Sequence, residues 1–160
     1  MIRVDIYTDG AARKNGQPDA VTAWGWVMLY NNKKAREDAG RELEFRTNNQ
    51  NELYAVVQSL RSIQPKPHLT VPLDIHIFSD SAYVVNANKT RLNNLSRARF
   101  VGKPNEEIWN MLIDELNRLE NHQVTFNKVK GHSGNQWNEY VDALINSVMD
   151  LNILSLKELV

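Results

Sequence analysis

The sequence predicts a single α/β domain built on a five-stranded mixed sheet, with helices on both faces. Three observations predict it. The chain has 160 residues, a length that suits one domain with one core. Three strand-like segments near the start are joined by short connections, which favours antiparallel pairing. Two later strand-like segments are each reached through a helical pattern, which favours parallel pairing and helices packed on the sheet.

The first three predicted strands lie in the first 46 residues. Residues 2–9 alternate between apolar and polar types and are rich in β-formers. Residues 10–22 contain glycine, asparagine and proline, so a loop is predicted there. Residues 24–30 make the second strand, and the two asparagines that follow are typical of a hairpin turn. A weak alternation over 37–46 predicts the third strand.

Helices and strands alternate in the middle of the chain. Either Thr47 or Asn48 can cap a helix that runs to about residue 63, and prolines end it. Residues 73–80 are predicted to form the fourth strand, because apolar and polar residues alternate there. A short helix is predicted after Ser81.

The last third of the chain holds three further elements. Pro104 and Asn105 open an amphipathic helix whose apolar residues form one stripe. A fifth strand follows over 124–129, and a final helix spans about 136–149. In the tail, residues 151–160, the spacing of a serine and a glutamate suits a capping box and indicates one more helical turn.

Composition excludes several classes of protein. No apolar run approaches the roughly 18 residues of a membrane span, and an acid inside the first apolar run argues against a secretory signal. The chain has no cysteine, so carboxylates or histidines must hold any metal. These features predict a cytoplasmic protein. We expect a monomer with no membrane contact and no obligate protein partner.

Net charge is zero, with 19 basic and 19 acidic residues, whereas nucleic-acid-binding domains are often strongly basic. The distribution matters more than the total, because residues 87–104 contain five basic residues and no acid. Such a segment can bind phosphates in a neutral protein. A solvated helix face or loop explains it equally well. The basic residues are Lys89, Arg91, Arg97, Arg99 and Lys103.

Four acids lie beside apolar residues on separate predicted elements. Asp9 and Asp80 end the first and fourth strands, Glu52 lies on the first turn of a helix, and Asp142 lies in the last helix. Singly, each acid has a simpler role as a turn residue, a helix cap, a dipole partner or a surface charge. If the four converge, they repel one another and need cations, and an all-oxygen site favours Mg²⁺ or Mn²⁺.

Five ordered motifs resemble ribonuclease H type 1, the bacterial-type ribonuclease HI family. They are YTDGAA, TNNQNELYAV, FSDSAYVVN, GKPNEEIW and VKGHSGNQWNEYVDAL. The resemblance covers about residues 1–150, the expected catalytic domain, and leaves 151–160 as a tail. It implies a ribonuclease H-like fold, in agreement with the predicted order of elements. It also implies an endonuclease that hydrolyses the RNA strand of RNA–DNA hybrids by a two-metal-ion mechanism and leaves 5′-phosphate and 3′-hydroxyl ends.

The resemblance also implies roles for particular residues. By this resemblance, the four acids would be ligands of two Mg²⁺ ions, and Mn²⁺ is expected to substitute for Mg²⁺. His132, in a loop with a glycine on either side, becomes the mobile histidine that helps proton transfer or product release. Without the resemblance, an ordinary loop histidine is the simpler interpretation. The implied metal ligands and catalytic residues are Asp9, Glu52, Asp80 and Asp142, joined in catalysis by His132.

Substrate contacts are implied in the same way. Asn15, Asn48 and Glu52 would contact the RNA strand or its 2′-hydroxyls, and Asn49 would lie against the DNA bases. Amides suit this task because they donate and accept without charge and so tolerate any base sequence. A helix-capping role for the two adjacent asparagines is compatible with it.

The DNA strand would be held at two further places. Thr47 and Asn105 match a pocket that grips a DNA phosphate, and the basic segment would be the family's protruding helix and loop. Better-known members carry several tryptophans in that segment. Here those positions fall near Arg91, Leu95 and Phe100, so the aromatic platform is missing or moved. We expect cleavage to survive and hybrid affinity to change.

Other classes remain as alternatives. A retroelement polymerase domain or a transposase-like nuclease shares the fold, but a single domain that starts with Met favours a free-standing enzyme. A catalytically silent hybrid-binding module would be supported by loss of a metal carboxylate, and all four positions are acidic. A sugar kinase or actin-like ATPase needs two such domains. A purely structural protein leaves the placement of asparagines, acids and bases unexplained.

Overall fold

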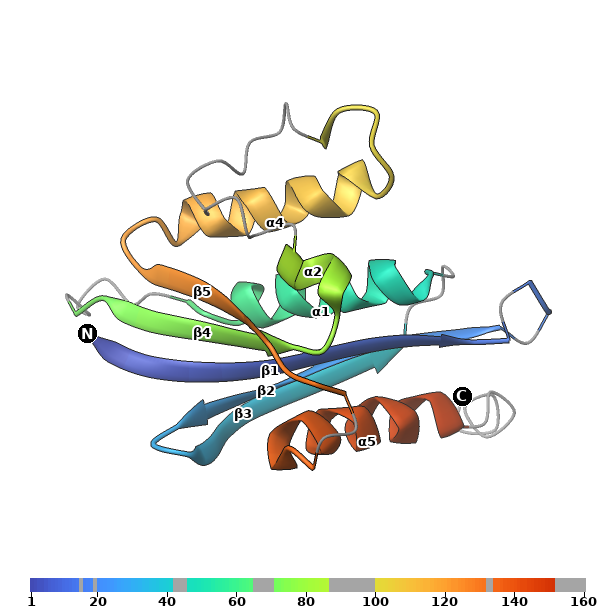
Figure 1. Cartoon of the computed structure of the whole chain (residues 1–160), viewed down its shortest axis with the longest axis horizontal. Helices are drawn as coiled ribbons and strands as arrows, with labels where there is room; N and C mark the ends of the chain where they lie inside the picture. The colour runs from blue at the N-terminus through green and yellow to red at the C-terminus, as the bar shows by residue number, and fades with distance from the viewer. Residues whose placement is uncertain are drawn as a thin grey trace.

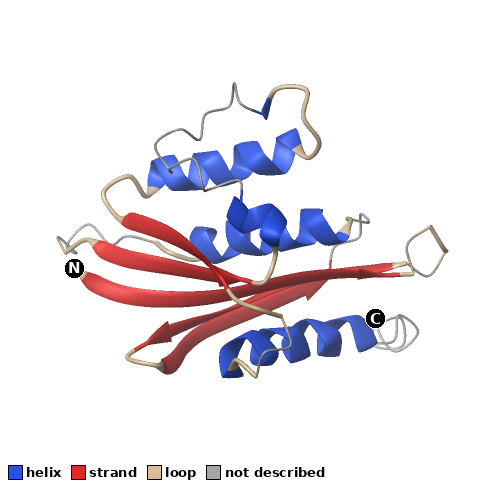
Figure 2. Ribbon diagram, viewed as in Figure 1, coloured by secondary structure: helices blue, strands red, loops and turns tan. Residues whose placement is uncertain are grey.

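The computed structural model describes residues 1–14, 16–18, 20–41, 46–64, 71–86, 100–131 and 134–151. Nine elements are present in these residues (Figures 1 and 2). They are β1 (Ile2–Arg13), β2 (Val21–Tyr30), β3 (Lys33–Arg41), α1 (Asn48–Arg61), β4 (Leu73–Ser79), α2 (Ala82–Asn86), α4 (Glu106–Arg118), β5 (Gln123–Lys128) and α5 (Gln136–Asp150).

The five strands form one mixed sheet in the order β3-β2-β1-β4-β5. The β1–β2 and β2–β3 pairs are antiparallel, and the β1–β4 and β4–β5 pairs are parallel. Helices α1 and α5 cover opposite faces, and α4 packs on the outer side of α1 (Figure 1). The predicted fold class and the predicted helices on both faces are confirmed.

Several strand boundaries differ from the sequence prediction. β2 begins at Val21 rather than at residue 24, and β5 spans Gln123–Lys128 rather than 124–129. β1 continues beyond Asp9 to Arg13, because residues 10–13 pair with β2 despite their loop-like composition. β3 begins at Lys33 rather than at residue 37. Both asparagines before it have positive φ angles, 51° and 60°, as a two-residue hairpin turn requires, so pairing resumes at once. The rest of the predicted third strand, residues 42–45, and the predicted turn in the tail lie outside the described residues.

The main core lies between α1 and the centre of the sheet. Leu53, Val57 and Leu60 on α1 are fully buried, and so are Ile6 and Ile77 on the two central strands. Burying one such side chain contributes roughly 1.5–3 kcal/mol. This packing holds α1 rigidly against β1, which matters for the acids that these elements carry.

A second, smaller layer packs on the opposite face. Val141 and Ile145 of α5 are fully buried against this side of the sheet. At Gly25 of β2 a Cβ atom would stand 2.6 Å from the Cγ2 atom of Ile145, so the helix approaches the sheet closely there. The Asn135 side chain caps α5 by accepting hydrogen bonds from two backbone amides. Within the described residues, no helix has the length and apolar character needed to cross a membrane.

Candidate metal centre

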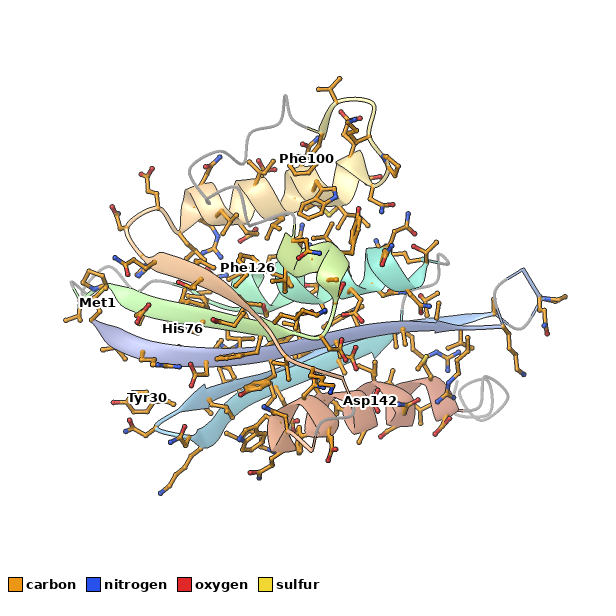
Figure 3. All side chains as sticks on the ribbon, viewed as in Figure 1. Met1, Tyr30, His76, Phe100, Phe126 and Asp142 are labelled. Atoms are coloured by element: carbon orange, nitrogen blue, oxygen red, sulfur yellow. The ribbon has the colours of Figure 1, made fainter. Side chains whose placement is uncertain are left out.

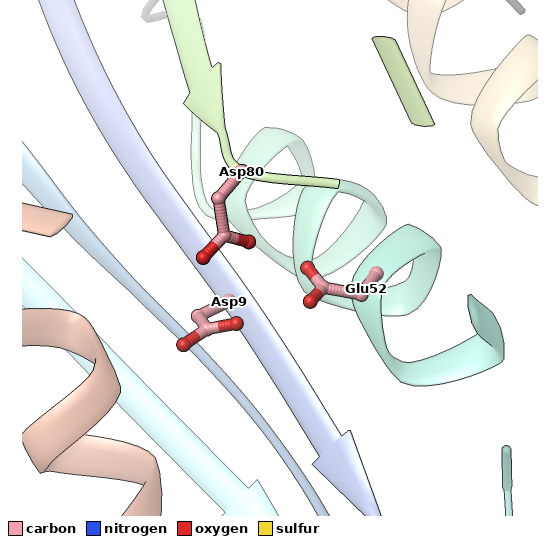
Figure 4. Close-up of side chains that lie close together, drawn as sticks. All are labelled: Asp9, Glu52 and Asp80. Atoms are coloured by element: carbon pink, nitrogen blue, oxygen red, sulfur yellow. The ribbon is translucent and has the colours of Figure 1, made fainter. Parts of the chain in front are cut away.

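Three acidic side chains converge at one edge of the sheet. Asp9 projects from β1, and Asp80 directly follows β4 (Figure 4). Glu52 was predicted on the first turn of its helix, but α1 begins at Asn48, so Glu52 lies at the start of the second turn. Each of the three acids offers one carboxylate oxygen, and the three oxygens lie within 4.8 Å of one another. Figure 4 shows the three carboxylates pointing into a common space.

Strand register brings the two aspartates together. β1 and β4 are adjacent and parallel, and Tyr7 pairs with Phe78. The next residues along both strands therefore reach the same edge of the sheet, where Asp9 and Asp80 lie. This is the carboxyl-terminal end of parallel strands, where open α/β sheets tend to place their sites.

Close contact between β1 and α1 adds the third acid. A Cβ atom at Gly10 would stand 2.3 Å from the backbone carbon of Asn51, so only glycine permits this approach. The side-chain Nδ2 atom of Asn51 donates to the carbonyl of Ala11, at 3.2 Å, and ties the first turn of α1 to the strand. Glu52 follows directly and is held beside Asp9.

We expect Gly10→Ala to destabilise the fold by about 2 kcal/mol or more, because the added methyl group meets backbone atoms that cannot move aside. If α1 moves away from β1 to make room for the methyl group, Glu52 moves away from Asp9, and metal binding should weaken. Denaturant unfolding measures the first effect, and titration with Mn²⁺ measures the second. Wild-type stability and wild-type Mn²⁺ affinity together would contradict the close contact.

Burial and mutual repulsion govern the charge of this cluster. Asp9 is only 6% exposed. Burial, and then the charge of Asp80, raise the pKa of Asp9 to about 7, although hydrogen bonding with Glu52 and with the amide of Gly10 opposes the shift. The pKa of Glu52 is raised well above its ordinary value by burial and by the charges of Asp9 and Asp80. The carboxylates therefore need a proton or a cation among them.

The fourth predicted ligand lies apart from this group. Asp142 is an exposed residue of α5, on the other side of the sheet from α1 (Figure 3). Its charge raises the pKa of Asp9, but less than that of Asp80 does. The structure thus brings three of the four predicted acids together, and ligation by Asp142 stays a prediction.

The cluster fits a divalent cation. Its ligands are carboxylate oxygens, which Mg²⁺ and Mn²⁺ prefer. Among the described residues, the Oε2 atom of Glu52 is buried and has no hydrogen-bond partner. A buried polar atom of this kind is costly unless a ligand satisfies it. A bound cation would satisfy that oxygen and offset the repulsion between the carboxylates.

Comparisons with known proteins identify the family. A family model described as RNase H matches residues 2–150 of the chain. The chain belongs to the ribonuclease H family. The ribonuclease H of Clostridium botulinum (strain Hall) is 42% identical over 157 residues, which cover 94% of this chain and 97% of that protein. The ribonuclease H of Thermoanaerobacter sp. (strain X514) is 36% identical over 155 residues, which cover 93% of this chain and 91% of that protein.

A solved structure supports the ribonuclease H fold. The crystal structure of LC9-RNase H1, described as a type 1 RNase H with the type 2 active-site motif, superposes with a TM-score of 0.71. The match covers 93% of this chain and 72% of that chain, at 22% sequence identity. At that identity the likeness concerns the fold alone. It agrees with the strand order and the helical layers described above.

Some residues assigned through the ribonuclease H motifs lie outside the described residues. Gly131, immediately before His132, is described: a Cβ atom there would stand 3.4 Å from the Oδ2 atom of Asp80, so this end of the loop passes beside the acidic cluster. The motif-assigned residues that are not described are His132, Asn15, Lys89, Arg91, Arg97 and Arg99, together with Leu95 of the basic segment.

The predicted substrate contacts on α1 lie at its exposed first turn. Asn48 and Asn49 are exposed, and the Asn48 Oδ1 atom accepts a hydrogen bond from the amide of Ala12 at 2.7 Å. Thr47 is the N-cap, and it forms a capping box with Gln50. No role was assigned to Gln50 from the sequence, although its spacing from Thr47 is the signature of a capping box.

Aromatic residues gather beside α2 in this ribonuclease H. Phe100 stacks on Trp109 with 4.7 Å between ring centroids, and Tyr83 lies 5.6 Å from the same Trp109 ring. Together with Lys103 they line a mainly apolar cavity of about 430 Å³. Phe100, near which one of the family's tryptophans was expected, is therefore buried against Trp109 in the core rather than exposed as a platform.

Proposed function

We propose that the protein is an endonuclease that hydrolyses the RNA strand of RNA–DNA hybrids and depends on divalent metal ions. The convergence of Asp9, Glu52 and Asp80, in a chain of the ribonuclease H family, carries this proposal. Asp142 supplies the fourth carboxylate when metal binds. Mg²⁺ is the expected ion, two per site, and Mn²⁺ is expected to substitute for it. We further propose that the enzyme acts as a cytoplasmic monomer.

The acidic residues hold and orient the metal ions. The chemistry that such ions supply when bound is activation of a water and stabilisation of the leaving 3′-oxygen, giving 5′-phosphate and 3′-hydroxyl ends. No nucleophilic side chain is needed. His132 is proposed to assist proton transfer or product release. Its neighbour Gly131 lies beside Asp80, which supports a place for this loop at the site.

Selection of a hybrid is proposed to depend on uncharged contacts near Glu52. Proteins distinguish RNA from DNA by the 2′-hydroxyl, and they reach it across the shallow minor groove. Asn48 and Asn49 are exposed on the first turn of α1, one turn before Glu52, which supports a role at the RNA 2′-hydroxyls and the DNA bases, respectively. Asn15 is proposed to join them. Thr47 and Asn105 are proposed to hold a DNA phosphate, and the basic segment around Arg97 to hold the DNA strand.

The deciding experiment uses one labelled RNA strand in three forms: paired with DNA, paired with RNA, and single-stranded. Each is incubated with Mg²⁺, with Mn²⁺ and with EDTA. We expect cleavage of the hybrid alone, with either metal and not with EDTA. Equal cleavage of the RNA duplex would overturn hybrid selectivity, and cleavage in EDTA would overturn the metal mechanism. The labelled fragments also report which end carries the phosphate.

A further inference from the structure

Asn105 adopts an unusual conformation at the start of α4. Its φ and ψ angles are 65° and 24°, in the left-handed region, and its side chain makes no capping hydrogen bond to the helix. An asparagine before a helix usually accepts a hydrogen bond from the first turn and stabilises it. Giving up that bond in a disfavoured backbone conformation indicates that the side chain is needed elsewhere.

The Asn105 side chain joins two other elements. Its Oδ1 atom accepts a hydrogen bond from the Nε2 atom of Gln50 on α1, at 2.9 Å. Its Nδ2 atom donates to the hydroxyl of Tyr83 on α2, also at 2.9 Å. The Trp109 indole donates to the same hydroxyl at 2.8 Å, which fixes the position of Tyr83.

Both the nitrogen and the oxygen of the Gln50 side-chain amide form hydrogen bonds. While Nε2 reaches Asn105, Oε1 accepts a hydrogen bond from the backbone amide of Thr47 at 2.9 Å. The Gln50 backbone amide in turn donates to the Thr47 hydroxyl oxygen at 3.2 Å. One side chain therefore sets the positions of both residues that the family motifs assign to a phosphate pocket.

Donor groups remain for a ligand after these bonds are made. The Thr47 hydroxyl oxygen accepts from Gln50, so its own hydrogen is available to donate. The Asn105 Nδ2 atom carries two hydrogens, and Tyr83 takes one of them. A cavity of about 290 Å³ adjoins Asn105, and it is lined by Arg46 and Gln50 and also by the acids Glu106 and Glu107.

The hydrogen bonds also connect two helices, α1 and α2, that begin close to residues of the acidic cluster. Gln50 is two residues before Glu52 on α1, and Tyr83 is three residues after Asp80. Asn105 lies between them. A phosphate held at Thr47 and Asn105 would therefore have a defined position relative to the carboxylates.

We propose that Gln50 is a positioning residue, which holds Thr47 and Asn105 in place as a pair of donors for one phosphate of the DNA strand. This inference rests on the proposed function and deepens it. Gln50 holds the Thr47 hydroxyl and the Asn105 amide in the positions that bind the phosphate, so less side-chain entropy is lost when the phosphate binds.

The test replaces Gln50 by methionine, which keeps the length of the side chain and removes its amide. We expect KM for the hybrid to rise about tenfold, the effect of losing one hydrogen bond to a charged group. We expect kcat and the affinity for Mn²⁺ to stay within about twofold, because the acidic cluster is retained. Gln58→Met is the matched control, since Gln58 lies on the same helix and its side-chain amide likewise donates a hydrogen bond to another side chain, the hydroxyl of Tyr54.

A modified substrate separates positioning from a general structural effect. Methylphosphonate linkages that remove one phosphate charge are placed singly along the DNA strand. In wild type and in Gln58→Met, one linkage should raise KM about tenfold, as the loss of one hydrogen bond to a charged group predicts. In Gln50→Met that linkage should have no further effect, because the contact is already lost. Thermal unfolding of each variant shows that the protein is folded.

The outcomes distinguish this inference from the proposed function. If Gln50→Met responds to the modified linkage as wild type does, the positioning role is wrong, and cleavage by wild type still supports the nuclease. If wild type cuts no hybrid, the proposed nuclease is wrong. Hybrid binding in EDTA, measured with the same linkages, then decides the positioning role without cleavage.

Discussion

Asp9→Asn is expected to reduce hybrid cleavage at least about a thousandfold, because several kcal/mol of transition-state stabilisation depend on the metal ions. The amide keeps the shape of the side chain and can still accept the hydrogen bond from Gly10. It cannot supply the charge that holds a cation. Hybrid binding in EDTA should be retained, since the proposed substrate contacts lie on other residues. Turnover at the wild-type rate would show that Asp9 does not hold the catalytic metal.

The same substitution should make the metal-free protein more stable. Asp9 is buried and shares its space with two other acids, so an uncharged residue removes repulsion. We expect a gain of roughly 1–3 kcal/mol at pH 8 in EDTA. Asp5→Asn is the matched control, because Asp5 lies on the same strand, outside the cluster, in an ion pair with Arg3. Loss of both activity and stability in Asp9→Asn would indicate a misfolded variant rather than a lost ligand.

Stability of the metal-free protein should fall as pH rises from about 4 to about 7. The pKa of Asp9 is raised from 3.8 to about 7, and the pKa of Glu52 is also raised, so the folded state binds more protons than the unfolded chain in this range. The stabilising contribution is fully present below the unfolded pKa and is lost as pH rises through the folded pKa. Each pKa unit corresponds to about 1.4 kcal/mol, so Asp9 alone accounts for up to about 4 kcal/mol.

Mg²⁺ should reverse this loss. A cation replaces the shared protons, so Mg²⁺ should stabilise the protein more at pH 8 than at pH 5.5. Denaturant unfolding at several pH values, with EDTA and with Mg²⁺, measures both effects. In Asp9→Asn the pH dependence in EDTA should be flatter. A metal-free stability that does not change between pH 5 and pH 8 would contradict the raised pKa values.

Periodicity predicted the elements well but could not set every boundary. The order of strands and helices followed from alternation, helical spacing and short connections. Residues 10–13 were predicted as a loop because of their composition, yet they pair with β2. Backbone pairing between distant segments overrides local preference there. The early start of β3 depends on the tight turn, which two asparagines in the left-handed conformation make.

The sequence identified the acids of the candidate site, but it did not predict how they come together. Ordered motifs singled out the acids, but no acid alone predicted a cluster. Their convergence depends on the register of β1 with β4 and on the contact at Gly10, and both are tertiary features. The spacing from Thr47 could have predicted the capping role of Gln50, but not its bond to Asn105, which crosses 55 positions of sequence. A hydrogen bond between residues so far apart in the sequence cannot be predicted from local sequence patterns.

The opposite placement of α1 and α5 has a consequence for how this site can vary. Asp9, Glu52 and Asp80 are assembled by the central strands and α1, whereas Asp142 belongs to a separate layer that meets the sheet at Gly25. A small shift of α5 would alter the fourth acid without disturbing the other three. The position of the fourth proposed carboxylate therefore depends on α5, and that of the other three depends on the central strands and α1. Because Gly25 pairs with Asp9 in the sheet, a substitution at this contact would lie next to the acidic cluster as well as under α5.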